Sequence, residues 1–292
     1  MSTDAKRRYA SAGFITLLVL SVLWPSPIVS VNRLWLGESL DIDELSFLGR
    51  EAPSWDVVFW CLAGLFALAI VQSAESLDFR GAWQQVRAVR LRFTLHHALL
   101  LVIGAALVAV IWLYADAPLM AFSERIQSET TEDAARLANR LGGGMNPAML
   151  VLFFLLGGVA YREKRWVSYA VAMAFAGLTA GLLAQIVKAL VGRARPELWL
   201  GPFQYAPGSA TSFPSGHTVG AFALAGVLMF ASPNWTLRIA AALLAASVGI
   251  SRILAFRHWP SDVTASAILG LLAAALFTRA VTRVTPERPD AP

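Results

Sequence analysis

Long apolar stretches separated by short polar segments recur along most of this 292-residue chain. Only 15% of its residues are charged, whereas soluble domains carry about a quarter. A segment that crosses a bilayer must satisfy its own backbone hydrogen bonds, as a helix does. The sequence therefore predicts an all-α, polytopic helical membrane protein of about eight spans, near residues 11–31, 55–74, 98–114, 147–160, 167–187, 216–231, 237–254 and 263–281.

Two of these spans leave alternatives open. The stretch 147–160 is short for a bilayer and could be a tilted or buried helix instead. The stretch 11–31 follows three basic residues, as the apolar part of a signal peptide would. However, the segment Trp24-Pro25-Ser26-Pro27 is a poor small-residue cleavage site. We therefore expect an uncleaved first helix.

Charged residues are distributed unevenly between alternate loops. If the N-terminus is cytoplasmic and every stretch spans, 14 of the 24 lysines and arginines fall in cytoplasmic segments, and the acidic residues of 38–56 and 116–133 fall outside. This is the positive-inside pattern. We expect a multi-pass protein of a plasma membrane or bacterial inner membrane with both termini cytoplasmic. In a membrane protein the distribution of the charges matters more than their sum, so the net charge of +5 does not indicate a nucleic-acid partner, and none is expected.

Three regions complete the expected organisation. Residues 1–97 form a two-span extension that ends in a basic cytoplasmic connector, 98–284 form the core, and 285–292 form a disordered cytoplasmic tail. In the connector, residues 78–92 suit either a helix lying on an anionic inner leaflet or a solvated linker. The acidic stretch 118–141 has a helical pattern, and we expect it on the outer surface near the functional site.

The segment Lys188-x6-Arg195-Pro196 follows the fifth span. Arginine presents a planar fork to phosphate oxygens, and lysine presents a compact charge. Taken alone, both residues could equally be anchors at the membrane interface.

The segment Pro214-Ser215-Gly216-His217 opens the sixth span. Serine is a favoured helix N-cap, and the free N–H groups of a helix start bind anions. Glycine lets a ligand approach the backbone, which would place His217 against a bound phosphate. The alternative is a capped helix with a histidine in the headgroup region.

The segment Ser251-Arg252-x5-His258-x3-Asp262 joins the last two spans. Asp262 lies in the first turn of the last helix, so its carboxylate could reach back to one nitrogen of His258. Such a contact fixes the tautomer of a histidine and leaves its other nitrogen free as a nucleophile. A purely structural His–Asp pair at a helix start is the alternative.

Together the three segments resemble the tripartite signature of the type 2 phosphatidic acid phosphatase (PAP2) superfamily, with every motif position filled. The resemblance covers residues 98–281 and implies a six-helix core, to which the two N-terminal spans are an addition. It is specific for fold and chemistry and much less so for substrate.

The resemblance also implies roles for individual residues. His258 would attack phosphorus and form a phosphohistidine, Asp262 would orient His258, and His217 would protonate the leaving group and then activate water. No metal or cofactor is implied. The phosphate oxygens would be held by Lys188, Arg195, Ser215, the Gly216 amide and Arg252.

The expected function is that of a lipid phosphatase with its active site on the periplasmic or extracellular face. Its substrate would be a phospholipid or isoprenoid-lipid phosphate: undecaprenyl diphosphate, phosphatidylglycerol phosphate, phosphatidate or a phosphate of lipid A. A phosphotransferase that passes the phosphate to an acceptor lipid differs only in the second half-reaction. A haloperoxidase of the same family is disfavoured by the eight spans. A channel or transporter would explain the spans and the outer cations, but not the arrangement of two histidines and an aspartate.

Overall fold

The computed structural model describes residues 78–282, except residues 90, 143–145 and 207–210. This part of the chain is helical and contains two isolated β-bridges but no strand, which confirms the all-α class. The predicted spans 11–31 and 55–74 lie outside the described residues. The helices are α5 (Phe79–Ala88), α6 (Leu95–Val110), the π-helical η1 (Ile111–Ala115), α7 (Asp116–Arg125), α8 (Glu129–Gly142), α9 (Asn146–Ala160), α10 (Lys164–Val191), the 3-10 turn η2 (Pro196–Leu198), α11 (Gly216–Ala231), α12 (Trp235–Leu254) and α13 (Pro260–Thr282).

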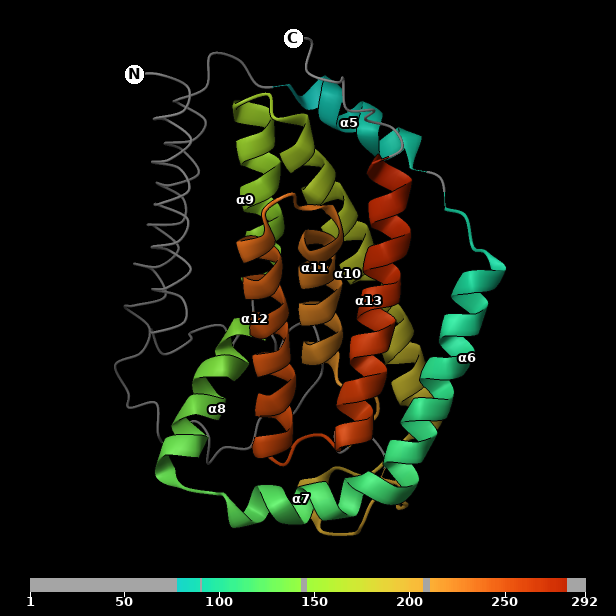
Figure 1. The fold of residues 1–292 in the computed structure, drawn as a ribbon, viewed down its shortest axis with the longest axis vertical. Coiled ribbons are helices and arrows are strands. Elements are labelled where there is room, and N and C mark those ends of the chain that lie inside the picture. Colours follow the sequence, from blue (N-terminus) through green and yellow to red (C-terminus); the bar gives the residue numbers. More distant parts are fainter. Residues whose placement is uncertain (1–77, 90, 143–145, 207–210, 283–292) are drawn as a thin grey trace.

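The upright helices α9 to α13 form a bundle around α11, which packs against α10, α12 and α13 (Figure 1). Helix α6 runs along one side of this bundle. Helix α7 lies across its lower end, and α8 follows beside α12, while α5 covers the upper end. The expected helical character of residues 118–141 is therefore confirmed.

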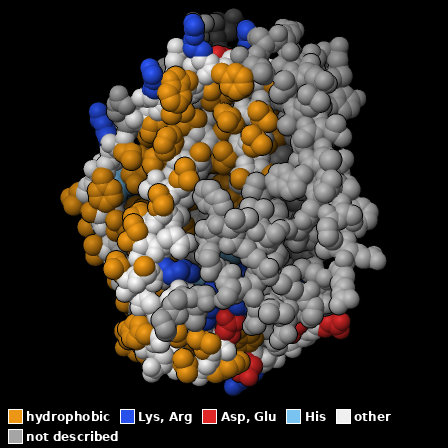
Figure 2. All heavy atoms as spheres, turned by 180° about the vertical axis from the view of Figure 1, so that it is seen from behind, with side chains coloured by type: hydrophobic (Ala, Val, Ile, Leu, Met, Phe, Trp, Pro, Cys, Tyr) orange, Lys and Arg blue, Asp and Glu red, His pale blue; other side chains and the backbone are white. Residues whose placement is uncertain are grey.

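Four segments are long and apolar enough to cross a membrane: Leu95–Arg125, Lys164–Val191, Trp235–Leu254 and Pro260–Val281. Together with the shorter apolar helices Pro147–Ala160 and Gly216–Ala231, they match the six spans predicted after residue 97. In the first of them the chain turns at η1, so that only α6 stands upright (Figure 1). Apolar side chains cover much of the described part of the face in Figure 2, as expected of a multi-pass membrane protein.

The connector contains the surface helix α5. The Asp78 carboxylate caps it by accepting a hydrogen bond of 2.8 Å from the Gly81 N–H. Gln85 is buried and ties α5 to the start of α10 through the Lys164 carbonyl, at 3.3 Å, whereas Trp83 on the same helix is exposed. The connector is thus helical and docked on the bundle, and its contact with an anionic leaflet stays a prediction.

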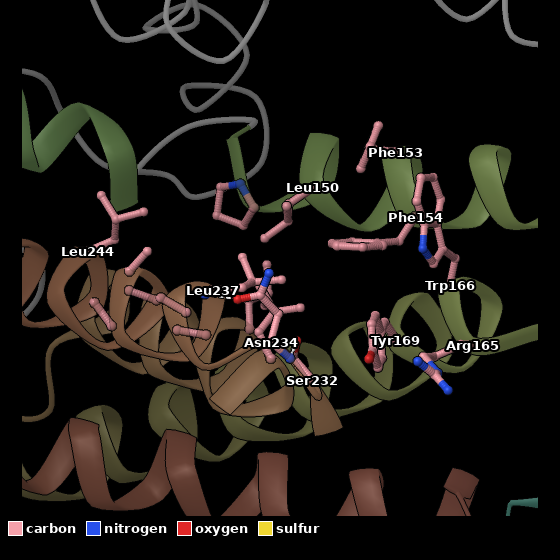
Figure 3. A pocket seen from close by; sticks show the side chains of 18 of the residues that line it. Leu150, Phe153, Phe154, Arg165, Trp166, Tyr169, Ser232, Asn234, Leu237 and Leu244 are labelled. Atoms are coloured by element: carbon pink, nitrogen blue, oxygen red, sulfur yellow. Dashed lines mark hydrogen bonds between the residues drawn. The ribbon is translucent and has the colours of Figure 1, made fainter. Parts of the chain in front are cut away.

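A cavity of about 520 Å³ opens between α9, α10, α11 and α12. Its lining is mostly apolar, with Leu150, Phe154, Trp166 and Leu237 around it and the polar Asn234 at one side (Figure 3). None of the predicted site residues lines this cavity. The candidate chemistry therefore lies elsewhere in the bundle.

Gly270 lets α13 pack directly on the backbone of α11. A Cβ atom at Gly270 would lie 2.7 Å from the Val219 carbonyl oxygen and 2.8 Å from the Ala223 nitrogen. We expect Gly270→Ala to destabilise the bundle by about 1–3 kcal/mol, because two backbones would have to separate. The readout is the thermal unfolding midpoint in detergent.

The matched control is Gly220→Ala, because an added Cβ at Gly220 on α11 meets no atom within 4 Å. We expect this control to leave the midpoint unchanged or slightly raised. Equal midpoints for the two variants would show that the α11–α13 contact tolerates the extra carbon.

Candidate active site

The three predicted segments come together at the lower end of the bundle in Figure 1, where α10 and α12 end and α11 and α13 begin. Lys188 lies in the last turn of α10 and Arg252 in the last turn of α12. His217 lies in the first turn of α11 and Asp262 in the first turn of α13, just after His258. Because successive helices run in opposite directions, segments far apart in sequence meet at one end.

Two of the predicted cations share one backbone acceptor. The Lys188 Nζ donates to the Thr211 carbonyl at 3.5 Å, and the Arg195 Nε donates to the same oxygen at 3.3 Å. The charges of Lys188, Arg195 and Arg252 also act on His217. The structure thus gathers the three predicted cations around this histidine.

The segment formed by α7 and α8 contacts the site through α12. The Asn139 side chain on α8 accepts a hydrogen bond from the Arg252 guanidinium. Gln127, between α7 and α8, donates to the Leu254 carbonyl at 2.9 Å. The expected proximity of residues 118–141 to the site is therefore observed, and Asn139 is a neighbour of Arg252 that the sequence did not reveal.

Ser215 is the N-cap of α11, as predicted, and its side chain is fully buried. Its Oγ accepts from the Thr218 hydroxyl at 2.9 Å, and its N–H donates to the Ser266 hydroxyl at 2.8 Å. Gly216 is exposed, and the position of a Cβ there has no neighbour within 4 Å. A ligand can therefore approach the start of α11 at Gly216, where the free N–H groups of a first helical turn lie.

The ring of His258 is held in one tautomer by a backbone carbonyl. Its Nδ1 lies 2.7 Å from the Ser212 carbonyl oxygen, which can only accept a hydrogen bond. Nδ1 therefore carries the hydrogen, and Nε2 has a free lone pair. Burial lowers the pKa of His258 to about 4; the Asp262 carboxylate opposes this shift, and the charges of Arg252 and Lys188 reinforce it. The ring is therefore neutral at neutral pH, as a nucleophile must be.

Asp262 lies beside His258, but its closest hydrogen bonds go elsewhere. Its Oδ2 is 3.7 Å from His258 Nδ1 and accepts hydrogen bonds from the Trp259 N–H, at 2.8 Å, and from the Ser212 hydroxyl. The direct hydrogen bond expected from the sequence is thus replaced by the Ser212 carbonyl. In the first turn of α13 the Asp262 carboxylate accepts from the Trp259 N–H, and the His258 imidazole therefore lies only within ion-pair distance of it.

Three residues of the site were not predicted: Ser212, Arg193 and Asp116. Ser212 joins the segments, because its N–H donates to the Arg193 carbonyl at 2.6 Å while its own carbonyl and hydroxyl contact His258 and Asp262. The Arg193 guanidinium bonds both Asp262 and Asp116, at 2.6 Å each. The only signals in the sequence were the place of Arg193, two residues before Arg195, and that of Asp116, just after an apolar span.

A neutral buried histidine among several cations, at one end of a membrane helix bundle, suits phosphoryl transfer, which requires positioning and neutralisation of negative charge. The chain matches the PAP2 superfamily over residues 165–286, which contain all the predicted site residues. A lipid A 1-phosphatase from Rhizobium etli is 34% identical over 198 residues, covering 59% of this chain and 81% of that protein. The chain therefore belongs to the PAP2 superfamily, as the motif resemblance implied.

Two further similarities are informative. A lipid A 1-phosphatase from Rhizobium johnstonii is 41% identical over 117 residues, but the match spans only 36% of this chain and 46% of that protein. The crystal structure of a transmembrane PAP2-type phosphatidylglycerolphosphate phosphatase from Bacillus subtilis is 25% identical, with a TM-score of 0.53, over 66% of this chain and 98% of that one. These relatives support the expected class, a membrane phosphatase.

Proposed function

We propose that this protein is an integral membrane lipid phosphatase that works through a phosphohistidine on His258. One observation carries the proposal: the Ser212 carbonyl holds the Nδ1–H of a neutral His258, which leaves Nε2 as the nucleophile in a site that also contains cations. The family match and the lipid phosphatase relatives support the same reaction class.

In the proposed first step, His258 Nε2 attacks phosphorus and the bond from phosphorus to the lipid oxygen breaks. His217, in its imidazolium form, gives its proton to that oxygen, and the lipid alcohol leaves. In the second step a water molecule, deprotonated by His217, attacks the phosphohistidine. Phosphate is released, and both histidines return to their starting states.

Cationic side chains would neutralise the negative charge that spreads over the phosphoryl oxygens. Lys188, Arg195 and Arg252 supply that charge, and the start of α11 adds backbone donors. The carboxylates of Asp116 and Asp262 both accept hydrogen bonds from Arg193 and are engaged with it. We therefore propose catalysis without a metal ligand at this site.

We propose the 1-phosphate of lipid A as the substrate, on the outer side of a bacterial inner membrane. Two relatives named lipid A 1-phosphatases support this substrate. Basic residues near the end of the bundle opposite the site, including Lys164 and Arg279, support a cytoplasmic location of that end. Figure 2 shows mostly lysine and arginine side chains at the upper end, and most of the visible acidic side chains, together with some lysine and arginine side chains, toward the lower end.

Purified protein in detergent should release phosphate from lipid A faster than from undecaprenyl diphosphate, phosphatidylglycerol phosphate or phosphatidate. Vanadate, which resembles a five-coordinate phosphorus, should inhibit the reaction, and a chelator should leave it unchanged. The measurement is phosphate release, with the His258→Ala variant as background. A different preferred lipid would replace the proposed substrate and leave the phosphatase reaction in place.

A phosphotransferase would give a different result in the same assay. The protein would become stably phosphorylated, and it would lose the label only when an acceptor lipid was added. Strict dependence on a divalent ion at the chemical step would contradict the proposed mechanism.

A further inference from the structure

Arg193 is a fully buried arginine placed between two fully buried carboxylates. One terminal nitrogen, Nη1, donates to Asp262 Oδ1 at 2.6 Å, and the other, Nη2, donates to Asp116 Oδ2 at 2.6 Å. Nη1 also donates to the Ser261 hydroxyl at 2.7 Å. Neither Arg193 nor Asp116 belongs to the motif positions, and the reaction steps above use neither of them.

Asp116, the first residue of α7, joins this helix to the start of α13. Its Oδ1 accepts from the Ser261 N–H at 2.8 Å, and its Oδ2 accepts from the Ser261 hydroxyl at 2.6 Å. One carboxylate thus binds both the guanidinium and the first turn of the helix that carries Asp262. These contacts fix the start of α7 against the first turn of α13.

The Arg193 guanidinium makes three further contacts. Its Nε donates to the Pro202 carbonyl at 2.9 Å. Its Cζ lies 4.1 Å from the ring centre of Trp112 and 5.1 Å from that of Trp259. Donors on all three nitrogens are used at once. A lysine ammonium cannot reproduce this planar set of contacts.

The cluster of Asp116, Arg193 and Asp262 can stabilise positive charge on the His258 ring. Asp116, Arg193 and Asp262 together carry one excess negative charge when both carboxylates are ionised, and Asp262 lies 3.7 Å from the His258 ring. When Nε2 bonds to phosphorus, the imidazole becomes positively charged. A carboxylate kept ionised and in place at that distance stabilises this charge as it develops.

We propose that Asp116 and Arg193 are positioning residues that hold Asp262 against His258. The inference rests on the proposed phosphohistidine mechanism. Because Arg193 bonds Asp262 and Asp116 bonds the first turn of α13, the two residues should affect the rate of the chemical step and leave substrate binding nearly unchanged.

The test compares kcat with KM in folded variants. For Arg193→Lys we expect kcat to fall roughly 10- to 100-fold, with KM within about threefold of the wild type, because small misplacements of catalytic groups have effects of this size. Asp116→Asn should lower kcat about tenfold by the same route. Their double variant should lose no more than the worse single variant, because both changes break the same chain of contacts.

Arg238→Lys is the matched control, since Arg238 is also an arginine beside an indole ring, 5.2 Å from the ring centre of Trp235, but lies in the first turn of α12 at the opposite end of the bundle from the site. It should keep the wild-type kcat. Ser261→Ala serves as a second variant that removes only a hydroxyl between Arg193 and Asp116, and it should also lower kcat at constant KM. Thermal unfolding of each variant separates a lower kcat from a smaller folded fraction.

Two results would overturn the inference: a folded Arg193→Lys or Ser261→Ala protein with kcat within twofold of the wild type, or a change confined to KM. A wild-type protein that releases no more phosphate than His258→Ala would overturn the proposed function itself, and the inference with it. The two failures are distinguishable because the second is seen before any positioning variant is made.

Discussion

Replacing His258 with alanine should reduce phosphate release roughly 10⁴- to 10⁶-fold, as removal of a catalytic nucleophile does in other enzymes. The variant lacks the Nε2 lone pair that is proposed to attack phosphorus. It also loses the hydrogen bond between Nδ1 and the Ser212 carbonyl, so its thermal stability should fall moderately. The measurement is phosphate release together with incorporation of radioactive phosphate into protein, and both should be abolished.

His96→Ala is the matched control for His258. His96 is an exposed histidine in the first turn of α6, away from the end of the bundle that holds the site (Figure 1). This variant should keep wild-type turnover. A folded His258→Ala protein with the turnover of the control would exclude a phosphohistidine at this position.

Replacing His217 with alanine should reduce turnover of the lipid substrate roughly 10²- to 10⁴-fold, the usual contribution of a general acid or base. His217 is proposed to act in both steps, first as the acid for the leaving lipid oxygen and then as the base for water. With an aryl phosphate, whose leaving group needs no proton, the first step should survive while the second stays slow. The phosphorylated protein should therefore accumulate.

Acid-labile, base-stable radiolabel on the protein is the measurement that detects this accumulation. The wild type, which completes the second step, should carry little label at steady state, and the double variant His217→Ala/His258→Ala should carry none. If His217→Ala hydrolysed aryl phosphate at the wild-type rate, His217 would have no role in activating water. Failure to become labelled at all would instead place its role before phosphoryl transfer.

The position of the membrane-crossing helices follows largely from the sequence. Runs of apolar residues report where a chain can be buried in lipid, and the six stretches predicted after residue 97 coincide with six apolar helices. The predicted end of the third span, near residue 114, coincides with η1, after which α7 crosses the end of the bundle. The charged residues Asp116, Glu124 and Arg125 of α7 mark the end of the apolar stretch in the sequence.

The motif residues were also readable in the sequence, because each short segment carries its own chemistry: a capped helix start, a helix end with a cation, or a histidine four residues before an aspartate. Ser215 is the N-cap that this pattern predicted. The pattern also correctly placed Asp262 near His258, but it assigned to them a direct hydrogen bond that the Ser212 carbonyl makes instead.

The sequence by itself thus determined the class of fold, the apolar helices after residue 97 and the short segments that meet at one end of the bundle, since all of these depend on local composition and spacing. Only the tertiary structure revealed how those residues are held. Ser212 is 46 residues from His258, and Asp116 is 77 residues from Arg193, so these contacts depend on how the loops and α7 fold across the end of the bundle. A buried charge needs partners in space, and a linear pattern does not contain that information.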